Sequence, residues 1–421
     1  MDVNAMGMTI HCCGFHTAQG PADSERLTDS WESHKGALGS AIPSPWSGHT
    51  PDMLTGMPAY LCPQDGTRAD ITALTWCCPV CRGPWDLEFE PSGPLSLNSL
   101  AGRVNSLWRY EEVLPLSAPA TTLGEGRTPL VPLTGTVSAK LDFLMPTLSF
   151  KDRGAVMLAE LARRLSPERV VADSSGNAGT AVAAYCARAS LPCTVYVPEG
   201  TSPKKTEQIR AHGARLEIVP GDREATAAAA RTAADAPGTF YASHVFNPYF
   251  LHGTKTYVYE LWEDLGGRLP DAIAVPAGNG TLLLGAALAT AELHAQGLID
   301  RRPALIAVQA EAVSPLAAAF RAGADDLPDA PAGPAAPTLA EGIAIPRPPR
   351  ARAILAAVRE LGGTFLTVTE DRIRAAQLDL AARGFYVETT GVACWAAVGD
   401  WTDRSVVVPL CGAGLKTGLA P

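Results

Sequence analysis

The sequence has few charged residues, and acidic residues outnumber basic ones. Charged residues make up 18% of the chain, and 34 Lys and Arg against 43 Asp and Glu give a net charge of −9. Proteins that bind nucleic acid or anionic membranes usually carry a basic surface. We therefore expect neither nucleic acid nor a membrane surface as a partner.

Cysteine is scarce as well. Ten cysteines in 421 residues are too few for a disulfide scaffold. The N-terminus has no positively charged start followed by an apolar run, which would be typical of a secretory signal. We expect reduced thiols and a cytoplasmic location.

Long apolar segments without helix-breaking residues are missing too. Ala272–Ala291 has no formal charge, but it contains a proline, an asparagine and three glycines. In lipid, these residues would leave backbone groups without hydrogen-bond partners. We expect no membrane span, and the 47% of hydrophobic residues then indicate a large globular core.

The first part of the chain shows no sustained periodicity. Residues 1–57 are rich in Gly, Pro, Ser, Thr and His, which predicts a disordered extension. One hypothesis is that the natural protein starts at Met53 or Met57. From about residue 103 onward, we expect the chain to be compact.

A zinc-ribbon-like pattern lies in the segment 58–91. Cys62 and Asp65 are separated by two residues, as are Cys78 and Cys81, with twelve residues between the pairs. This is the spacing of a zinc ribbon in which Asp65 replaces one cysteine. A carboxylate can bind zinc, so two interpretations stay open: a metal site, or a ribbon that has kept its shape and lost its ion. The sequence slightly favours the second.

From about residue 130 onward, short apolar segments alternate with helical patterns. Arg169–Ala172, Cys193–Val197 and Arg215–Val219 are each followed by an amphipathic segment, and the pattern resumes from Ala272 to Pro409. Units of this length are typical of βαβ crossovers. The sequence therefore predicts an α/β protein with a doubly wound, open parallel sheet.

One lysine in this pattern is a candidate for chemistry. Lys151 follows Phe150 at the start of a helical pattern. Desolvation and the positive end of a helix dipole both disfavour an ammonium ion, and a neutral amine can form a Schiff base with a carbonyl cofactor. The alternative is a solvated lysine that merely begins a helix.

Three glycine-containing turns lie at ends of predicted strands, at Ser174–Gly179, Gly278–Thr281 and Cys411–Gly414. Helix N-termini at the carboxyl ends of parallel strands offer free N–H groups to anions. A phosphorylated aldehyde that acts on an amino acid needs one such turn for its phosphate and another for the substrate carboxylate. Pyridoxal phosphate fits this description.

Several motifs resemble those of one family, the threonine synthases. They belong to the pyridoxal-phosphate-dependent enzymes that share the tryptophan synthase β-subunit fold (fold type II). The similarity runs from about Tyr60 to Lys416 and includes an N-terminal ribbon. The motifs begin at Arg109 (RYEE), Leu123 (LGEGRTPL), Ser149 (SFKDRG), Ser174 (SSGNAG), Asn247 (NPYFLHGTKTY), Ala340 (AEGIAI) and Gly384 (GFYVE).

The resemblance implies two doubly wound parallel-sheet domains with the cofactor between them. The expected large domain comprises residues 92–152 and 259–421, and the small domain comprises residues 153–258. A homodimer is the family's common state and is expected here.

The resemblance also implies roles for individual residues. Lys151 would hold the cofactor and move protons, and Asn177 would bind its ring oxygen. The expected cofactor-binding residues further include Gly278, Asn279, Gly280, Thr281, Leu282 and Cys411. The expected substrate-binding residues are Ser174, Ser175, Gly176, Ala178 and Arg153, with Lys204 and Lys255 as further candidates for the substrate phosphate.

Four residues depart from the family pattern, and one of them, Ala413, lies where the family often has a polar residue, which leaves the choice of substrate open. Thr281 and Leu282 replace the last two residues of the family's phosphate turn, and Cys411 lies where the family has Thr or Ser beside the pyridine nitrogen. A thiol, like a hydroxyl, would leave that nitrogen unprotonated, which favours elimination and replacement. The alternative for Cys411 is a small buried apolar residue.

The expected function is the conversion of O-phosphohomoserine and water to threonine and phosphate. One alternative is a related enzyme that performs β-elimination on serine or threonine, or β-replacement on O-phosphoserine. A third hypothesis is an inactive binding protein that uses the ribbon to contact a partner.

Overall fold

The structure is a computed structural model that describes residues 57–117, 119–201, 203–328 and 336–420. All of them belong to one compact unit, Gly48–Pro421. The predicted disordered extension lies, apart from Met57, outside these residues. Among the helices that are described, none has the length and apolar character that crossing a membrane requires.

The ribbon segment forms a small antiparallel sheet in the order β2-β1-β3. Tyr60 of β1 pairs with Ala69 of β2 on one side and with Leu87 of β3 on the other. Each strand has only two residues, and they are β1 (Tyr60–Leu61), β2 (Arg68–Ala69) and β3 (Asp86–Leu87). So short a sheet needs other contacts for its stability.

The larger sheet has six strands in the order β12-β11-β10-β13-β5-β4. Its strands pair in parallel except β4, which pairs antiparallel with β5 at one edge. The strands are β4 (Leu130–Pro132), β5 (Val137–Lys140), β10 (Ala272–Pro276), β11 (Ala304–Ala310), β12 (Thr364–Val368) and β13 (Val406–Pro409). Every residue of β10 and β13 is buried, as expected for strands covered on both faces.

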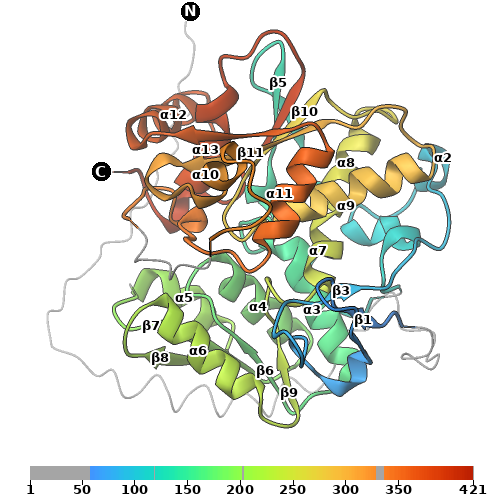
Figure 1. Cartoon of the computed structure of the whole chain (residues 1–421), viewed down its shortest axis with the longest axis vertical. Coiled ribbons are helices and arrows are strands. Elements are labelled where there is room, and N and C mark those ends of the chain that lie inside the picture. The colour runs from blue at the N-terminus through green and yellow to red at the C-terminus, as the bar shows by residue number, and fades with distance from the viewer. Residues whose placement is uncertain (1–56, 118, 202, 329–335, 421) are drawn as a thin grey trace, which may run out of the picture. The chain divides into compact units, whose positions relative to one another are not determined.

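The smaller sheet is entirely parallel and has the order β8-β7-β6-β9. It lies with α4, α5 and α6, while β10 and β11 lie with α8, α9 and α11 (Figure 1). Its strands are β6 (Arg169–Ala172), β7 (Cys193–Pro198), β8 (Arg215–Val219) and β9 (Thr239–Tyr241). All of them fall within the expected small domain, although its exact bounds stay a prediction.

Helices connect most of these strands. The α-helices are α2 (Leu97–Leu100), α3 (Lys151–Leu165), α4 (Asn177–Arg188), α5 (Pro203–Ala211), α6 (Arg223–Ala234), α7 (Tyr249–Thr254), α8 (Thr256–Asp264), α9 (Thr281–Ala295), α10 (Pro315–Arg321), α11 (Ala351–Glu360), α12 (Glu370–Ala382) and α13 (Thr389–Val398). Short 3₁₀ helices are η1 (Ile71–Ala73), η2 (Leu107–Val113), η3 (Asp142–Leu144), η4 (Glu311–Val313), η5 (Glu341–Ile343) and η6 (Gly414–Lys416). The predicted doubly wound α/β fold is thereby confirmed.

A cluster of four charged side chains is buried where α3, α8 and β5 meet. Arg153 forms two hydrogen bonds with Asp142, at 2.8 and 2.9 Å, and two with Glu260, at 2.6 and 3.0 Å. Lys140 lies 2.9 Å from Glu260, and all four side chains are fully buried. Burial alone would raise the pKa of Glu260, but the charges of Arg153 and Lys140 outweigh this effect and lower it. Glu260 therefore stays ionised between its two cationic partners.

We expect Glu260→Ala to lower the free energy of unfolding by about 3–5 kcal/mol, because it removes a buried carboxylate that two buried cations share and leaves Arg153 with Asp142 alone and Lys140 with Asp264 alone. Urea unfolding measures this loss. The control is Asp371→Ala, which removes an exposed ion pair with Arg374 and should cost less than about 1 kcal/mol. Equal losses in the two variants would contradict the structural importance of the cluster.

Candidate active site

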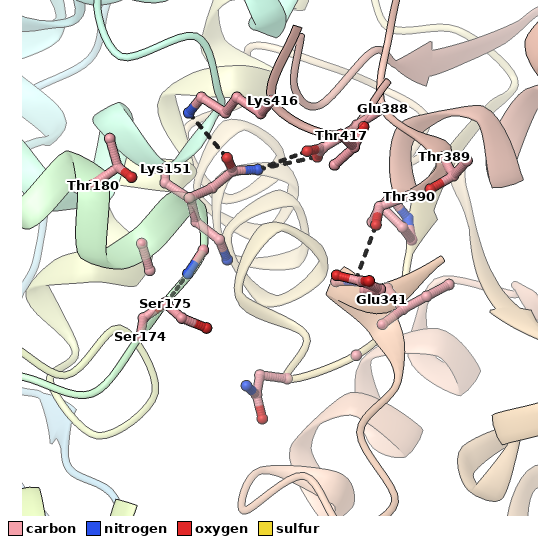
Figure 2. Close-up of a pocket in the computed structure, with 18 of the residues that line it drawn as sticks. Lys151, Ser174, Ser175, Thr180, Glu341, Glu388, Thr389, Thr390, Lys416 and Thr417 are labelled. Carbon is pink, nitrogen blue, oxygen red and sulfur yellow. Dashed lines mark hydrogen bonds between the residues drawn. The ribbon is translucent and has the colours of Figure 1, made fainter. Parts of the chain in front are cut away.

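The described residues form a cavity of about 550 Å³ at the carboxyl ends of both parallel sheets. Lys151 and the two serines of the β6–α4 turn lie on one side, and Glu341, Thr389 and Thr390 lie on the other (Figure 2). Further lining residues come from the turn between β10 and α9 and from the C-terminal segment. This is the position that the crossover topology predicts for a ligand.

Lys151 is the first residue of α3, and its amine faces the cavity. Nζ lies 4.3 Å from the centre of the Phe150 ring and 5.7 Å from that of Phe250. Its hydrogen-bond partner is the hydroxyl of Thr281, at 3.4 Å. Burial lowers the pKa of Lys151 to about 8, and the positive charge of Arg223 acts in the same direction. A substantial fraction of this amine is therefore neutral at physiological pH, as a nucleophile requires.

Three helices that begin at the cavity have no side-chain cap. They are α3 after Phe150, α4 after Gly176 and α9 after Gly280, and none of these preceding residues accepts a side-chain hydrogen bond from the helix. At α4 and α9 the first N–H groups are therefore available to a ligand, and the helix dipole favours a negative one. At α3, Asp152 N and Arg153 N already donate to Ser149 O and Phe150 O. The cavity thus offers separate anion-binding positions beside the amine.

The turn before α9 depends on its two glycines. Gly280 has φ +73°, a conformation that other residues rarely adopt. A Cβ at Gly278 would lie 2.9 Å from the backbone of Ile343, so the turn and η5 are in direct contact. The absence of side chains at these two positions brings the backbone N–H groups close to the cavity.

Asn177 lies in a polar network that links α4 to the C-terminal part of the chain. Its Nδ2 donates to both carboxylate oxygens of Glu388, at 2.9 and 3.1 Å, and its Oδ1 accepts from Lys416 at 3.0 Å (Figure 2). Burial raises the pKa of Glu388, which the hydrogen bond from Asn177 opposes. This network fixes the orientation of the Asn177 amide.

Five charged residues that line the cavity were not among the sequence candidates, and they are Asp173, Arg223, Glu341, Glu388 and Lys416. Glu388 ends a motif that carried the resemblance, and Lys416 follows the glycine-containing turn after β13. Arg223 begins α6, just beyond the carboxyl end of β8, and its guanidinium has no hydrogen bond or ion pair with any of the described residues. The topological rule about strand ends, applied to β8, would have found Arg223.

Most of the sequence candidates line the cavity together. They are Lys151, Ser174, Ser175, Gly176, Asn177, Ala178, Gly278, Asn279, Gly280, Thr281 and Leu282. Their assignment to cofactor or substrate stays a prediction. Cys411 is fully buried beside them, and its carbonyl accepts a hydrogen bond from Phe150 N, but it does not line the cavity. Burial raises the pKa of its thiol well above the ordinary value, so Cys411 is neutral.

Two of the proposed phosphate-binding cations were wrong. Arg153 points into the buried ion cluster instead of the cavity. Lys255 is also fully buried and pairs with Glu292 at 2.7 Å. Their ion pairs link α3 and the α7–α8 segment to neighbouring elements, which sequence spacing alone could not reveal. The side chain of Lys204 lies outside the described residues.

The residues of the cavity fit pyridoxal phosphate. An aldehyde needs a partly neutral amine, which Lys151 provides, and a phosphate needs free N–H groups, which the turn Gly278–Leu282 provides. An amino-acid substrate needs a second anion-binding position, and the start of α4 supplies one. Each requirement is met by a different element.

Comparison with known proteins gives the same class. Residues 121–412 match the family "Pyridoxal-phosphate dependent enzyme". The solved structure of a threonine deaminase from T.th. is 26% identical, with a TM-score of 0.58, and the alignment covers 70% of this chain and 94% of that one. Maize serine racemase, at 21% identity and a TM-score of 0.59, shares the fold over 69% of this chain and 89% of its own. The chain belongs to the pyridoxal-phosphate-dependent enzymes of fold type II.

Within this family, the chain is similar to threonine synthases. The threonine synthase of Methanosarcina acetivorans is 30% identical over 362 residues, which cover 82% of this chain and 87% of the relative. The threonine synthase of Mycobacterium leprae is 34% identical over 326 residues, which cover 73% of this chain and 87% of the relative. The resemblance found in the motifs is thereby confirmed.

We expect the capture of pyridoxal phosphate by the cofactor-free protein to accelerate with pH and to level off above about 8, because only the neutral form of Lys151 reacts. The visible absorbance of the bound cofactor measures the rate. Lys151→Ala should abolish this absorbance. Lys255→Gln, which alters a different lysine that is fully buried, should retain the absorbance. A capture rate that does not change with pH would contradict the lowered pKa of Lys151.

Proposed function

We propose that this enzyme is a threonine synthase, a lyase that converts O-phosphohomoserine and water to threonine and phosphate. The similarity to two threonine synthases supports this reaction. The observation that carries it is the combination, around one cavity, of Lys151, two uncapped helix N-termini and Arg223, a cation without a partner among the described residues. A substrate with a carboxylate, an amine and a distal phosphate matches these groups.

The chemistry at the substrate α-carbon requires a base and a place for negative charge. Pyridoxal phosphate, when bound, stabilises negative charge at that carbon. The amine of Lys151 removes the α-proton and later returns a proton, for which its pKa of about 8 is well suited. The Thr281 hydroxyl, 3.4 Å from the amine, orients it within the cavity.

The two ends of the substrate would bind to different elements. The N–H groups of the turn Ser174–Ala178, at the start of α4, would hold its carboxylate. The turn Gly278–Leu282 would bind the phosphate of the cofactor through its backbone N–H groups. The phosphate of the substrate therefore needs a separate binding group, such as a cationic side chain. Arg223 is a suitable candidate, because it lines the cavity and none of the residues that the structure describes neutralises it.

The other functions considered from the sequence lack comparable support. A β-elimination enzyme acting on serine or threonine has no phosphate to bind and leaves Arg223 without a role. O-phosphoserine, the substrate of the β-replacement alternative, does carry a phosphate. Only analysis of the products can therefore distinguish β-replacement from threonine synthesis. An inactive binding protein would not need the lowered pKa of Lys151. The proposal includes a homodimer and a cytoplasmic location, as expected for the family.

The first test is product analysis with cofactor-loaded protein and O-phosphohomoserine. We expect threonine and free phosphate in equal amounts, because one phosphate leaves for each water added. Amino-acid chromatography and a phosphate assay measure them. Turnover of serine, threonine or O-phosphoserine, with none of O-phosphohomoserine, would instead support one of the alternatives.

The second test concerns Arg223. We expect Arg223→Leu to raise KM for O-phosphohomoserine about 10- to 100-fold, which corresponds to one charge-assisted hydrogen bond of about 1.5–3 kcal/mol. The visible absorbance of the bound cofactor should remain. The control is Arg215→Leu at an exposed arginine outside the cavity. An unchanged KM in Arg223→Leu would remove this residue from substrate binding.

A further inference from the structure

The ribbon brings four metal-ligating groups together, far along the chain from the cavity residues. One ligand atom from each of Cys62, Asp65, Cys78 and Cys81 lies within 4.8 Å of all the others. We propose that these four residues bind one zinc ion in a tetrahedral site of three thiolates and one carboxylate. The sequence alone had favoured a ribbon without an ion.

The distances match such a site. Any two sulfur ligands at the corners of a zinc tetrahedron are about 3.8 Å apart, given zinc–sulfur bonds of about 2.3 Å. The sulfurs of Cys62 and Cys81 are 3.4 Å apart, and Cys78 Sγ is 3.3 Å from Asp65 Oδ2. A disulfide would need about 2.05 Å between sulfurs, and the three cysteines are free.

The two halves of the ribbon have the same backbone geometry. Gly66 N donates to Cys62 O at 3.0 Å, and Arg82 N donates to Cys78 O at 2.9 Å. Gly66 and Arg82 both have positive φ, at +73° and +60°. Arg82 adopts this left-handed conformation although it has a side chain, so the second turn has the same backbone conformation as the first at this position. Asp65 therefore occupies in the first turn the place that Cys81 occupies in the second.

The hydrogen bonds around the ligand atoms follow the same symmetry. Thr67 N donates to Asp65 at 2.9 Å, and Gly83 N donates to Cys81 Sγ at 3.4 Å. Val80 N donates to Cys78 Sγ at 3.4 Å. Backbone donors directed at ligand atoms fix their orientation and stabilise their anionic forms, as in the surroundings of known metal sites. Asp65 is thus oriented as a ligand and not as a solvated side chain.

The ribbon has few backbone hydrogen bonds of its own, but it shares a hydrophobic core with α3 and α7 and contacts elements close to the cavity. Trp85 N donates to Phe246 O at 3.2 Å, and Arg350 binds Asp86 at 2.7 Å. Two residues before Phe246, His244 lies 3.4 Å from Asn279 of the glycine turn. A metal ion would fix the two-residue strands of the ribbon and thereby the segment that supports this turn.

The experiment uses the full-length, cofactor-loaded protein and needs no activity measurement. Elemental analysis of protein purified with added zinc should find about one zinc ion per chain, as a tetrahedral site of four protein ligands requires. Removing the ion with a chelator should lower Tm, and adding Zn²⁺, but not Mg²⁺, should restore it. A protein that contains no zinc and binds none when it is added would overturn the proposal.

Variants test the ligands individually. Asp65→Ala changes an exposed residue, so it should fold, and it should lose zinc affinity at least tenfold. Asp65→Cys should retain zinc and, after replacement by Co²⁺, should show stronger sulfur-to-cobalt absorbance than the wild type because it has a fourth thiolate. The matched control is Cys77→Ala, which removes a buried cysteine outside the cluster and should leave the zinc content unchanged. An unchanged affinity in Asp65→Ala would remove the carboxylate from the site.

Discussion

The position of Lys151 depends on the ion pairs of Arg153. The guanidinium of Arg153 lies two residues further along α3 and binds Asp142 and Glu260 from inside the protein. Because these pairs are fully buried, they are not screened by solvent, and they determine where α3 begins. The lysine then faces the cavity because the arginine faces the opposite way. About half a helix turn thus separates the candidate catalytic amine from the ion pairs that support it.

The parallel topology explains why the other cavity residues meet. The turns before α4 and α9 each follow the carboxyl end of a strand, β6 in the smaller sheet and β10 in the larger one. Both turns leave the first N–H groups of their helices without a side-chain cap. The chain thus builds two anion-binding positions from backbone alone, and side chains such as Arg223 and Glu388 add charged groups around them.

Much of this arrangement could be predicted from the sequence, and the failures have physical causes. β6 and β12 are mostly apolar or β-branched segments between helices, and β8 alternates charged and apolar residues; the structure has strands at all three. The helix α7 was missed because its six residues are too few for periodicity, and α13 because it is apolar on all sides. Arg153 was misassigned because sequence spacing does not show whether its long side chain points into the cavity or into the protein interior behind α3.

The contact between α3 and α7 limits how the cavity can change shape. A Cβ at Gly253 would lie 2.0 Å from the carbonyl oxygen of Arg153, and a Cβ at Gly154 would lie 2.4 Å from the Phe250 ring. The two helices therefore touch without an intervening layer of side chains, and neither can slide along the other without a clash. The wall of the cavity that carries Lys151 is therefore closely packed from behind. It faces η5 and the start of α13, which carry Glu341, Thr389 and Thr390.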